Sequence, residues 1–300
     1  MNAKTLAGLV RPFTMLGPAT GVLCGSVAAA ARLEVAWPLP RVGLALAAAI
    51  FANAASNAWN QAFDADIDRV NKPARPIPSG QASVAAAMSL GHACALLSLG
   101  AAVVHAAISG IPWFAACVAI GLASTWAYSA PPLRTKRSML GALATIAVPR
   151  GFLVPVAAWS VVASPSTFEP FALGLVPGLF VLGAAATKDF ADVEGDRAHG
   201  CRTLPVVLGA ARASRVVAPF LFAPFVLYPL LALAGAIGRP VLAWAVVAAL
   251  LGGFGLVTAR ALTKDPDSLA TERNHPAWRG MYLLLLANQA AVAIIYALTR

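Results

Sequence analysis

Charge is what this sequence has least of. Only 11% of its 300 residues are Asp, Glu, Lys or Arg, whereas 59% are hydrophobic, and the mean hydropathy is +0.75. Soluble domains carry roughly 25% charged and 45–50% apolar residues. Too few polar side chains are present to cover a globular surface, so the composition excludes a soluble protein and predicts an all-α bundle embedded in a membrane.

Cysteine is also scarce, and the familiar nucleotide and nucleophile motifs are missing. Cys24, Cys94 and Cys117 fall in apolar runs and Cys201 stands alone in a polar segment, so neither a disulfide framework nor a CxxC metal site is predicted. No Gly-rich Walker loop or dinucleotide fingerprint occurs. No Ser/His/Asp or Cys/His arrangement is evident either, which favours chemistry that needs no strong protein nucleophile.

Long apolar stretches divide the chain. About 20 residues are needed to cross about 30 Å of hydrocarbon as a helix. Nine stretches qualify, with approximate limits 12–31, 42–63, 83–105, 110–129, 139–161, 167–187, 216–237, 241–259 and 281–299. A tight turn at Ser109 and Gly110 joins the third and fourth. We expect a single integral-membrane domain over residues 1–300, with motif loops on the inner side at about 64–82, 130–138 and 188–215.

The basic residues predict the orientation. Of 22 Lys and Arg residues, 17 fall on one side of the nine predicted spans, and Arg150 lies within a span. The other side holds Arg32, Arg41, Arg239 and Arg300. Because basic loops stay in the cytoplasm, the N-terminus is predicted inside, in the cytoplasmic membrane if the protein is bacterial. The net charge of +10 is then mostly a topology signal, and no nucleic-acid partner is expected.

The 12 acidic residues gather in two short windows, which follow the second and sixth predicted spans. The windows hold Asp64, Asp66, Asp68, Asp189, Asp192, Glu194 and Asp196. Crowded carboxylates repel one another unless a positive species binds between them. The sequence therefore predicts a cation site at the inner ends of these two spans.

Spacing predicts that each window presents one helical face. Asn60, Asp64 and Asp68 recur every fourth residue, and Asn53 and Asn57 extend that polar stripe into the apolar span. Amides at that depth are expected to face the bundle interior or a wet cavity. In the second window Asp189, Asp192 and Asp196 follow an i, i+3, i+7 pattern.

Carboxylate oxygens suit Mg²⁺, which proteins hold by one or two carboxylates together with phosphate oxygens of the substrate. The predicted metal ligands, which are also the predicted catalytic acids, are Asp64, Asp68, Asp192 and Asp196, with Asn60 in support. Asp189 and Asp66 are second choices, either as ligands or behind the ligands. The sequence thus predicts a Mg²⁺ and diphosphate site.

Basic residues beside both windows are predicted to bind the diphosphate. They are Lys72, Arg75, Arg134, Lys136, Arg137 and Lys188. Binding to lipid headgroups is the alternative for Lys72, Arg75 and Lys188. A topology signal is the alternative for Arg134, Lys136 and Arg137, of which at least one is expected to contact the diphosphate. Three roles stay open for Arg150: it contacts the acceptor, it bonds to a structural partner such as a backbone carbonyl, or its side chain reaches toward the membrane surface.

In these motifs the chain resembles the UbiA-type intramembrane prenyltransferases. That family carries NxxxDxxxD after its second helix and DxxxD after its sixth, matched by Asn60, Asp64, Asp68 and by Asp192, Asp196. Its tyrosine followed by basic residues is matched by YSAPPLRTKR, which begins at Tyr128. The resemblance implies a helical bundle around a central cavity, in which two Mg²⁺ ions bridge the aspartates to an isoprenyl diphosphate. The resemblance implies that Tyr128 faces the carbocation, whereas its position alone also fits a tyrosine of the membrane interface.

Within the family, RPIPSG, YSAPPL and the second acidic window look most like the branch of chlorophyll synthases, homogentisate prenyltransferases and geranylgeranylglyceryl phosphate synthases. The resemblance implies a lipophilic or aromatic acceptor from quinone, isoprenoid lipid or chlorin biosynthesis. Gln61 departs from the Asn-Asp pair common elsewhere in the family, which removes one carboxylate from the first window.

Two other functions use acidic residues within membrane helices. A CDP-alcohol phosphatidyltransferase also uses aspartates and a divalent metal within helices, but its expected DG pair occurs nowhere in this sequence. A transporter is expected to carry acidic residues near the membrane midplane. Here they are predicted at the cytoplasmic ends, so the prenyltransferase reading is favoured.

Overall fold

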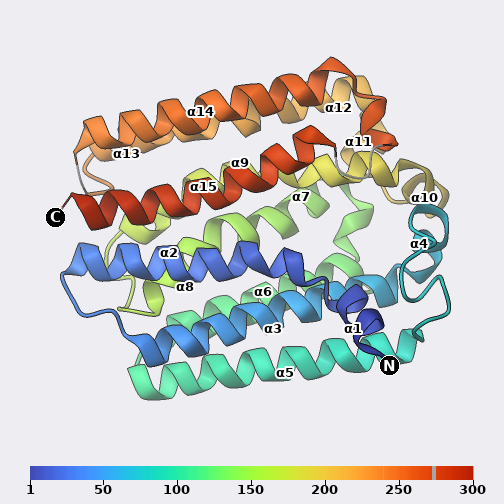
Figure 1. Ribbon diagram of the computed structural model, residues 1–300, viewed down its shortest axis with the longest axis horizontal. Coiled ribbons are helices and arrows are strands. Elements are labelled where there is room, and N and C mark those ends of the chain that lie inside the picture. The colour runs from blue at the N-terminus through green and yellow to red at the C-terminus, as the bar shows by residue number, and fades with distance from the viewer. Residues whose placement is uncertain (239, 272–274, 300) are drawn as a thin grey trace.

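The computed structural model describes residues 1–238, 240–271 and 275–299 of the chain. Over these ranges the chain is helical and contains no strand. Eight helical segments are long and apolar enough to cross a membrane, and the long helices lie side by side with similar axis directions (Figure 1). The predicted all-α membrane bundle is confirmed. Three residues of the predicted charge distribution, Arg239, Arg273 and Arg300, lie outside the described residues.

Short 3₁₀ or π turns, labelled η, interrupt several helices. In chain order the elements are α1 (Ala3–Val10), η1 (Pro12–Met15), α2 (Leu16–Leu33), α3 (Leu39–Phe63), α4 (Ala65–Asn71), α5 (Val84–Ser109), α6 (Trp113–Ser129), η2 (Thr135–Arg137), α7 (Met139–Ala147), η3 (Val148–Phe152), α8 (Leu153–Ser160), α9 (Glu169–Ala184), η4 (Ala185–Asp192), α10 (Val193–Ala198), α11 (Leu204–Leu208), α12 (Ala210–Val217), η5 (Ala218–Leu221), η6 (Ala223–Val226), α13 (Leu227–Leu233), α14 (Val241–Lys264), η7 (Ser268–Ala270) and α15 (Pro276–Leu298).

Most candidate spans begin and end within about six residues of the predicted limits, but the one that begins at Glu169 runs to Ala198, 11 residues beyond the predicted end at 187. Eight of the nine predicted stretches correspond to helical segments of at least 18 residues, some of them containing a short turn. The predicted stretch 110–129 is α6, whose 17 residues reach about 26 Å at about 1.5 Å per residue. Because α6 is shorter than the usual hydrocarbon thickness, the count of nine spans stays a prediction. Gly110, with φ of +69°, forms the predicted tight turn after α5.

Proline explains the most broken span. The segment from α12 to α13 changes to 3₁₀ geometry twice, and Pro219 and Pro224 stand at the starts of those turns. Proline has no backbone N–H and crowds the preceding turn, which favours a bend or a break in the helix. Gly255 of α14 lets the neighbouring helix approach this bend, because a Cβ there would lie 2.1 Å from the carbonyl oxygen of Leu221.

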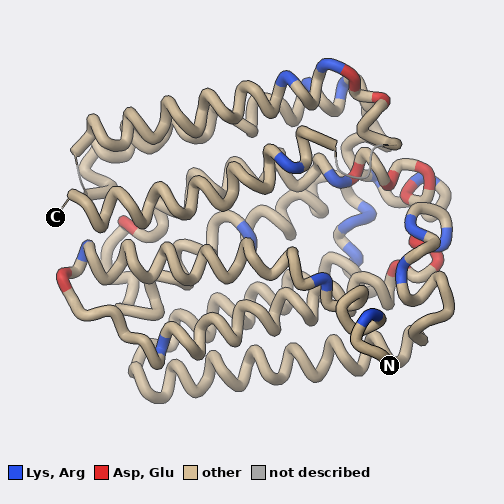
Figure 2. Tube along the Cα trace, in the orientation of Figure 1, with Lys and Arg blue, Asp and Glu red and all other residues tan. Residues whose placement is uncertain are grey.

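Charged residues concentrate at one end of the bundle. Figure 2 shows most Asp, Glu, Lys and Arg residues around α4 and α10, at the end where the N-terminus also lies. The last helix, α15, runs from this end to the opposite one (Figure 1). An apolar bundle can keep charges in contact with water only at its ends, so the fold collects them there. The cytoplasmic orientation of this end stays a prediction.

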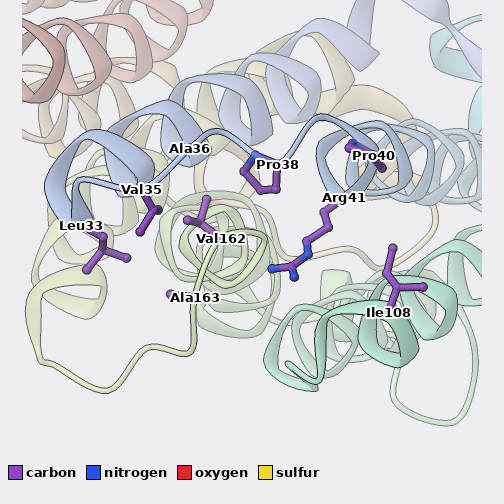
Figure 3. A pocket seen from close by; sticks show the side chains of 9 residues that line it. All are labelled: Leu33, Val35, Ala36, Pro38, Pro40, Arg41, Ile108, Val162 and Ala163. Carbon is purple, nitrogen blue, oxygen red and sulfur yellow. The ribbon is translucent and has the colours of Figure 1, made fainter.

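An open hollow of about 510 Å³ lies elsewhere in the bundle. Its lining includes Leu33 at the end of α2, Val35 after it, Ile108 of α5 and Val162 after α8. Figure 3 shows the side chain of Arg41 reaching into it. None of the residues around it belongs to either acidic window, so this hollow is separate from the predicted site.

A buried carboxylate ties helix ends together away from the acidic windows. Glu169, the first residue of α9, accepts hydrogen bonds from Arg32 Nε at 2.9 Å, the Gly238 backbone N–H at 2.7 Å and the Tyr296 hydroxyl at 2.5 Å. These partners belong to α2, the segment before α14, and α15. One side chain therefore fixes four parts of the chain, helped by its place in the first turn of a helix.

We expect Glu169→Leu to destabilise the fold. The substitution leaves the Arg32 guanidinium and the Gly238 N–H without their acceptor. We expect the free energy of unfolding to fall by about 2 kcal/mol. The loss is not larger because solvent screens Arg32, whose side chain is 41% exposed. Thermal unfolding of the purified protein in detergent measures this as a lower Tm. The control, Glu34→Gln, removes a charge from an exposed position nearby, and an equal loss of Tm in the control would contradict the assignment.

Candidate active site

The first acidic window begins where α3 ends. Asp64 leaves the helical conformation, with φ of −102° and ψ of 14°, and α4 starts at the next residue. The Asn60 side-chain N–H donates to Asp64 Oδ2 at 2.7 Å. On its other side Asp64 pairs with Lys136, and Arg134 Nη2 lies 3.7 Å away. The segment after α6 thus places two predicted diphosphate-binding cations against the first predicted metal ligand.

Burial in this cluster changes protonation equilibria. Lys136 is only 4% exposed, and burial lowers the pKa of its ammonium to about 8. The opposite charge of Asp64 is in direct contact with it. Separating such a buried pair is costly unless another anion takes the place of the carboxylate.

The second carboxylate of the window forms a separate buried pair. Asp68 lies in α4 and is 3% exposed. Arg75 Nη1 donates to both of its oxygens, at 2.8 Å and 2.6 Å. Burial raises the pKa of the Asp68 carboxyl, and the Arg75 charge opposes that rise. The expected continuous helical face is wrong in detail, because the break at Asp64 starts a new helix for Asp68.

The structure brings the second acidic window against the first. Lys72, which ends α4, forms an ion pair with Asp192. Asn71 makes two further links: its Nδ2 donates to the Asp192 carbonyl oxygen at 2.9 Å, and its Oδ1 accepts from the Gly195 N–H at 2.8 Å. A Cβ on Gly195 would lie within 2.7 Å of the Asn71 side chain, which explains glycine there. Two windows more than 120 residues apart in sequence form one charged cluster.

The second window is not a regular α-helix. Residues 185–192 form the 3₁₀ segment η4, and α10 follows. Side chains three apart superpose in a 3₁₀ helix, so Asp189 and Asp192 still share a face although the predicted α-helical period is wrong. Asp189 is buried. Asp196 accepts a hydrogen bond from Thr203 Oγ1 at 3.2 Å.

Tyr128 and Lys188 lie together at the edge of this cluster. The Lys188 ammonium is 5.2 Å from the centre of the Tyr128 ring and 3.5 Å from its hydroxyl. Tyr128 is near the end of α6, and Lys188 precedes Asp189 in η4. The ring therefore already faces a cation beside the acidic residues, a contact that its negative π-face favours.

Some predicted residues lie apart from these pairs. Arg137 is exposed, and none of the ion pairs found among the described residues includes it. Asp66 is also exposed and pairs with Arg69 of its own helix at 2.7 Å. Arg150 lies deeper in the bundle, in η3, with Ser56 Oγ 3.5 Å from its guanidinium.

Arg11 lies beside the cluster, although the sequence did not predict it as a site residue. It was counted only among the 17 basic residues that predict the orientation. Arg11 breaks the chain between α1 and η1 with φ of +53°. Burial lowers the pKa of its guanidinium to about 10, and the charges of Arg75, Arg150, Asp68 and Asp192 also act on it. The available signal was an arginine directly before the proline that opens the first span.

The asparagine stripe and Gln61 hold that break in place. Asn57 Nδ2 donates to the Val10 carbonyl oxygen at 2.8 Å, and Gln61 Nε2 donates to that of Leu9 at 2.8 Å. These carbonyls end α1 and have no helical partner of their own. Gln61, the departure from the family pattern, therefore supports the segment that carries Arg11.

The positions of the carboxylates decide whether they could hold a metal ion. Over the part of the chain that the structure describes, no three His, Cys, Asp or Glu side chains lie close enough to hold a metal ion. Asp64, Asp68 and Asp192 instead each face a basic side chain. Their hard oxygen atoms fit Mg²⁺. This ion takes six ligands, and water and phosphate oxygens commonly supply those that the carboxylates do not.

Comparison with known proteins identifies relatives over most of the chain. The family model described as the UbiA prenyltransferase family matches residues 19–295. The digeranylgeranylglyceryl phosphate synthase of Methanopyrus kandleri is 35% identical over 95% of this chain and 97% of its own length. The bacteriochlorophyll synthase 33 kDa chain of Cereibacter sphaeroides is 30% identical over 88% of this chain and 84% of its own.

Solved structures match the fold. A UbiA homolog from Archaeoglobus fulgidus, solved with GPP and Mg²⁺, superposes with a TM-score of 0.72 and 20% identity over 97% of this chain and all of that one. A structure of digeranylgeranylglyceryl phosphate synthase gives a TM-score of 0.69 and 20% identity over 98% of both chains.

We expect Asn71→Ala to loosen the contact between the two windows. The Gly195 N–H loses its acceptor, and the loss of about 1 kcal/mol per hydrogen bond makes its exchange with solvent roughly five times faster. Hydrogen–deuterium exchange of peptides covering α10 measures this. Asn2→Ala, which removes a cap from α1 instead, is the control; unchanged exchange of α10 in Asn71→Ala would show that the contact is not holding this helix.

Proposed function

This chain belongs to the UbiA prenyltransferase family and is a membrane-embedded enzyme of prenyl transfer, and we propose that its charged cluster binds an isoprenyl diphosphate together with Mg²⁺. The single observation that carries the proposal is the pairing of Asp64, Asp68 and Asp192 with Lys136, Arg75 and Lys72 in one cluster. Each of these three carboxylates faces a basic side chain, at the end of the apolar bundle where charged residues concentrate.

The pairing suggests how the ligands enter. A diphosphate is an acceptor for Lys and Arg, and its arrival offers the basic side chains an alternative to the carboxylates. The carboxylates released in this way become available to a divalent cation. Each partner of the ion pairs thus gains a ligand of opposite charge, so neither is left buried and unpaired.

The residues that would hold Mg²⁺ are Asp64 and Asp68 on one side and Asp192 and Asp196 on the other, with Asn60 and Asp189 beside them. When bound, the metal supplies positive charge that stabilises the diphosphate as leaving group. We propose two ions, since the carboxylates come from two separate windows and one small octahedral ion rarely takes four of them. Support comes from the Archaeoglobus fulgidus relative, solved with GPP and Mg²⁺.

The basic side chains bind and orient the donor. In the transfer, the allylic C–O bond breaks and its electron pair leaves with the diphosphate, while an electron pair of the acceptor forms the new bond to carbon and the acceptor loses a proton. Lys72, Arg75, Arg134 and Lys136 are placed to hold the departing negative charge. The Tyr128 ring, which already accommodates an ammonium at 5.2 Å, is suited to face the allylic cation.

The apolar walls of the bundle would hold the prenyl tail and keep water from the cation. For the acceptor we propose a lipophilic or aromatic molecule of quinone, isoprenoid lipid or chlorin biosynthesis. Relatives support this range: one is a probable homogentisate phytyltransferase of Oryza sativa, 32% identical over 66% of this chain and 51% of its own length. The others are the glyceryl phosphate and bacteriochlorophyll synthases described above.

We expect Asp68→Asn to lower kcat/KM for geranylgeranyl diphosphate by about 100-fold or more, because a proposed metal ligand loses its charge. Asp66→Asn is the matched control on the same helix, 72% exposed in its side chain, and should stay within about threefold of the unchanged enzyme. Transfer is measured with labelled donor, Mg²⁺ and a panel of acceptors, with and without chelator. Full activity of Asp68→Asn, or activity that survives complete removal of Mg²⁺, would refute the metal assignment.

The donor-binding cations give a second matched pair. Arg75→Gln should raise KM for the donor diphosphate by about 10- to 100-fold, since a charge-assisted contact to phosphate is lost. Arg69→Gln removes an exposed guanidinium from the same segment and should change KM by less than about twofold. If both variants weaken donor binding equally, the basic residues act only through general attraction of anions, and the specific role of Arg75 fails.

A further inference from the structure

Arg150 lies in the middle of a span, where a charged side chain is rare. It falls 11 residues after Met139 and ten before Ser160, the limits of the α7 to α8 segment. At about 1.5 Å per residue, its backbone is about 15 Å from either end of the span. An arginine at such depth is costly and is commonly functional or paired.

No carboxylate pairs with Arg150 among the described residues. The six ion pairs found there involve Arg32, Arg69, Lys72, Arg75, Arg134 and Lys136 as cations. The one side-chain hydrogen bond of Arg150 reaches Ser56 Oγ at 3.5 Å, and Ser56 is already bonded to Thr125 at 2.6 Å. A guanidinium has five N–H donors, so most of its capacity is unused. The side chain is nevertheless exposed within the bundle.

The backbone around Arg150 is fixed by close packing. Residues 148–152 form a single π turn, a feature often found at functional sites. A Cβ on Gly151 would lie 2.6 Å from the Pro177 carbonyl oxygen, and a Cβ on Gly174 would lie 2.3 Å from that of Phe152. Glycine at these positions lets the turn sit directly on α9. The turn is therefore held in place, which presents Arg150 to the interior at a defined position.

The surroundings of Arg150 contain polar groups that already have partners. A small cavity of about 40 Å³ beside it is also lined by Tyr228, Asn288 and Gln289. The Tyr228 hydroxyl donates to Asn288 Oδ1 at 2.7 Å, and Gln289 bonds to Thr20 and to the Gly17 carbonyl oxygen. The cavity is too small to hold an acceptor molecule.

Depth separates Arg150 from the proposed diphosphate position. Ser56 precedes Asp64 by eight residues of α3, which places it about 12 Å further into the bundle. Ser56, the hydrogen-bond partner of Arg150, therefore lies deeper in the bundle than the carboxylates of the first window. The charge of Arg150 also contributes to the low pKa of Arg11, on which Asp68 and Asp192 act in the opposite direction. An oxyanion beside Arg150 would give its guanidinium a partner of opposite charge.

We propose that Arg150 binds an oxyanion carried by the acceptor, a carboxylate or a phosphate, and so selects acidic acceptors and fixes their approach to the allylic carbon. This inference rests on the proposed function, because it assigns the second substrate of the same reaction. The two sources share one chemistry, the charge-assisted pairing of an oxyanion with a guanidinium.

The experiment compares Arg150→Gln, Arg150→Lys and Arg41→Gln in the purified full-length enzyme. Arg41→Gln removes an equal charge far from the cluster. Acceptor binding is measured calorimetrically without donor or Mg²⁺, and kcat/KM with both, for an aromatic carboxylate, a prenylglyceryl phosphate and an uncharged ester of each, the methyl ester of the carboxylate and the dimethyl ester of the phosphate. We expect Arg150→Gln to weaken binding of the acidic acceptor by about 10- to 100-fold, to leave the esters unchanged, and to keep the KM of the donor within about twofold.

Partial recovery in Arg150→Lys, with wild-type Tm, would support a charge role and exclude a folding defect. Preference for the carboxylate or for the phosphate identifies the source of the oxyanion. Equal losses with acids and esters, or a loss confined to donor binding, would overturn the inference while the proposed function stands. If the unchanged enzyme prenylates no acceptor and does not bind the donor, the proposed function itself fails.

Discussion

Opposite charges in contact at one end of an apolar bundle are the interaction on which the rest of this structure depends. Within hydrocarbon a lone charge is costly, and the low local dielectric strengthens each pair that forms. The chain meets this constraint by bringing α4 and α10 together, so that carboxylates from one segment meet cations from another. These same ion pairs are the groups that a metal and a diphosphate would separate.

Irregular helix geometry serves this arrangement. The break at Asp64, the 3₁₀ segment η4 and the π turn at Arg150 all occur where polar side chains are presented. Elsewhere the spans are largely regular, apart from bends at proline. Interrupted helices let side chains from one span point in directions that a straight helix does not offer, and the freed backbone groups are tolerated where neighbouring polar groups bind them.

Several features of the site followed from sequence spacing, whereas others required the folded chain. The two acidic windows and their basic neighbours were visible from the positions of the charged residues, because carboxylates are rare in this chain. Asn60 and Asp64 keep the predicted contact across one helical turn, but a new helix starts after Asp64, and Asp192 ends a 3₁₀ segment in place of the predicted α-helix. Arg11 was missed because its neighbours are remote in sequence and its charge also fits the ordinary excess of base on one side.

The sequence by itself determined the membrane environment, the approximate spans and the two groups of acidic residues, because hydrocarbon thickness and charge cost act on local composition. Only the tertiary structure decided which acid meets which base, that Asp66 and Arg137 lie outside the cluster, and that Arg150 stands in the interior without a carboxylate partner among the described residues. The Lys72–Asp192 pair joins segments 120 residues apart. No local pattern encodes it, since it depends on how the helices pack.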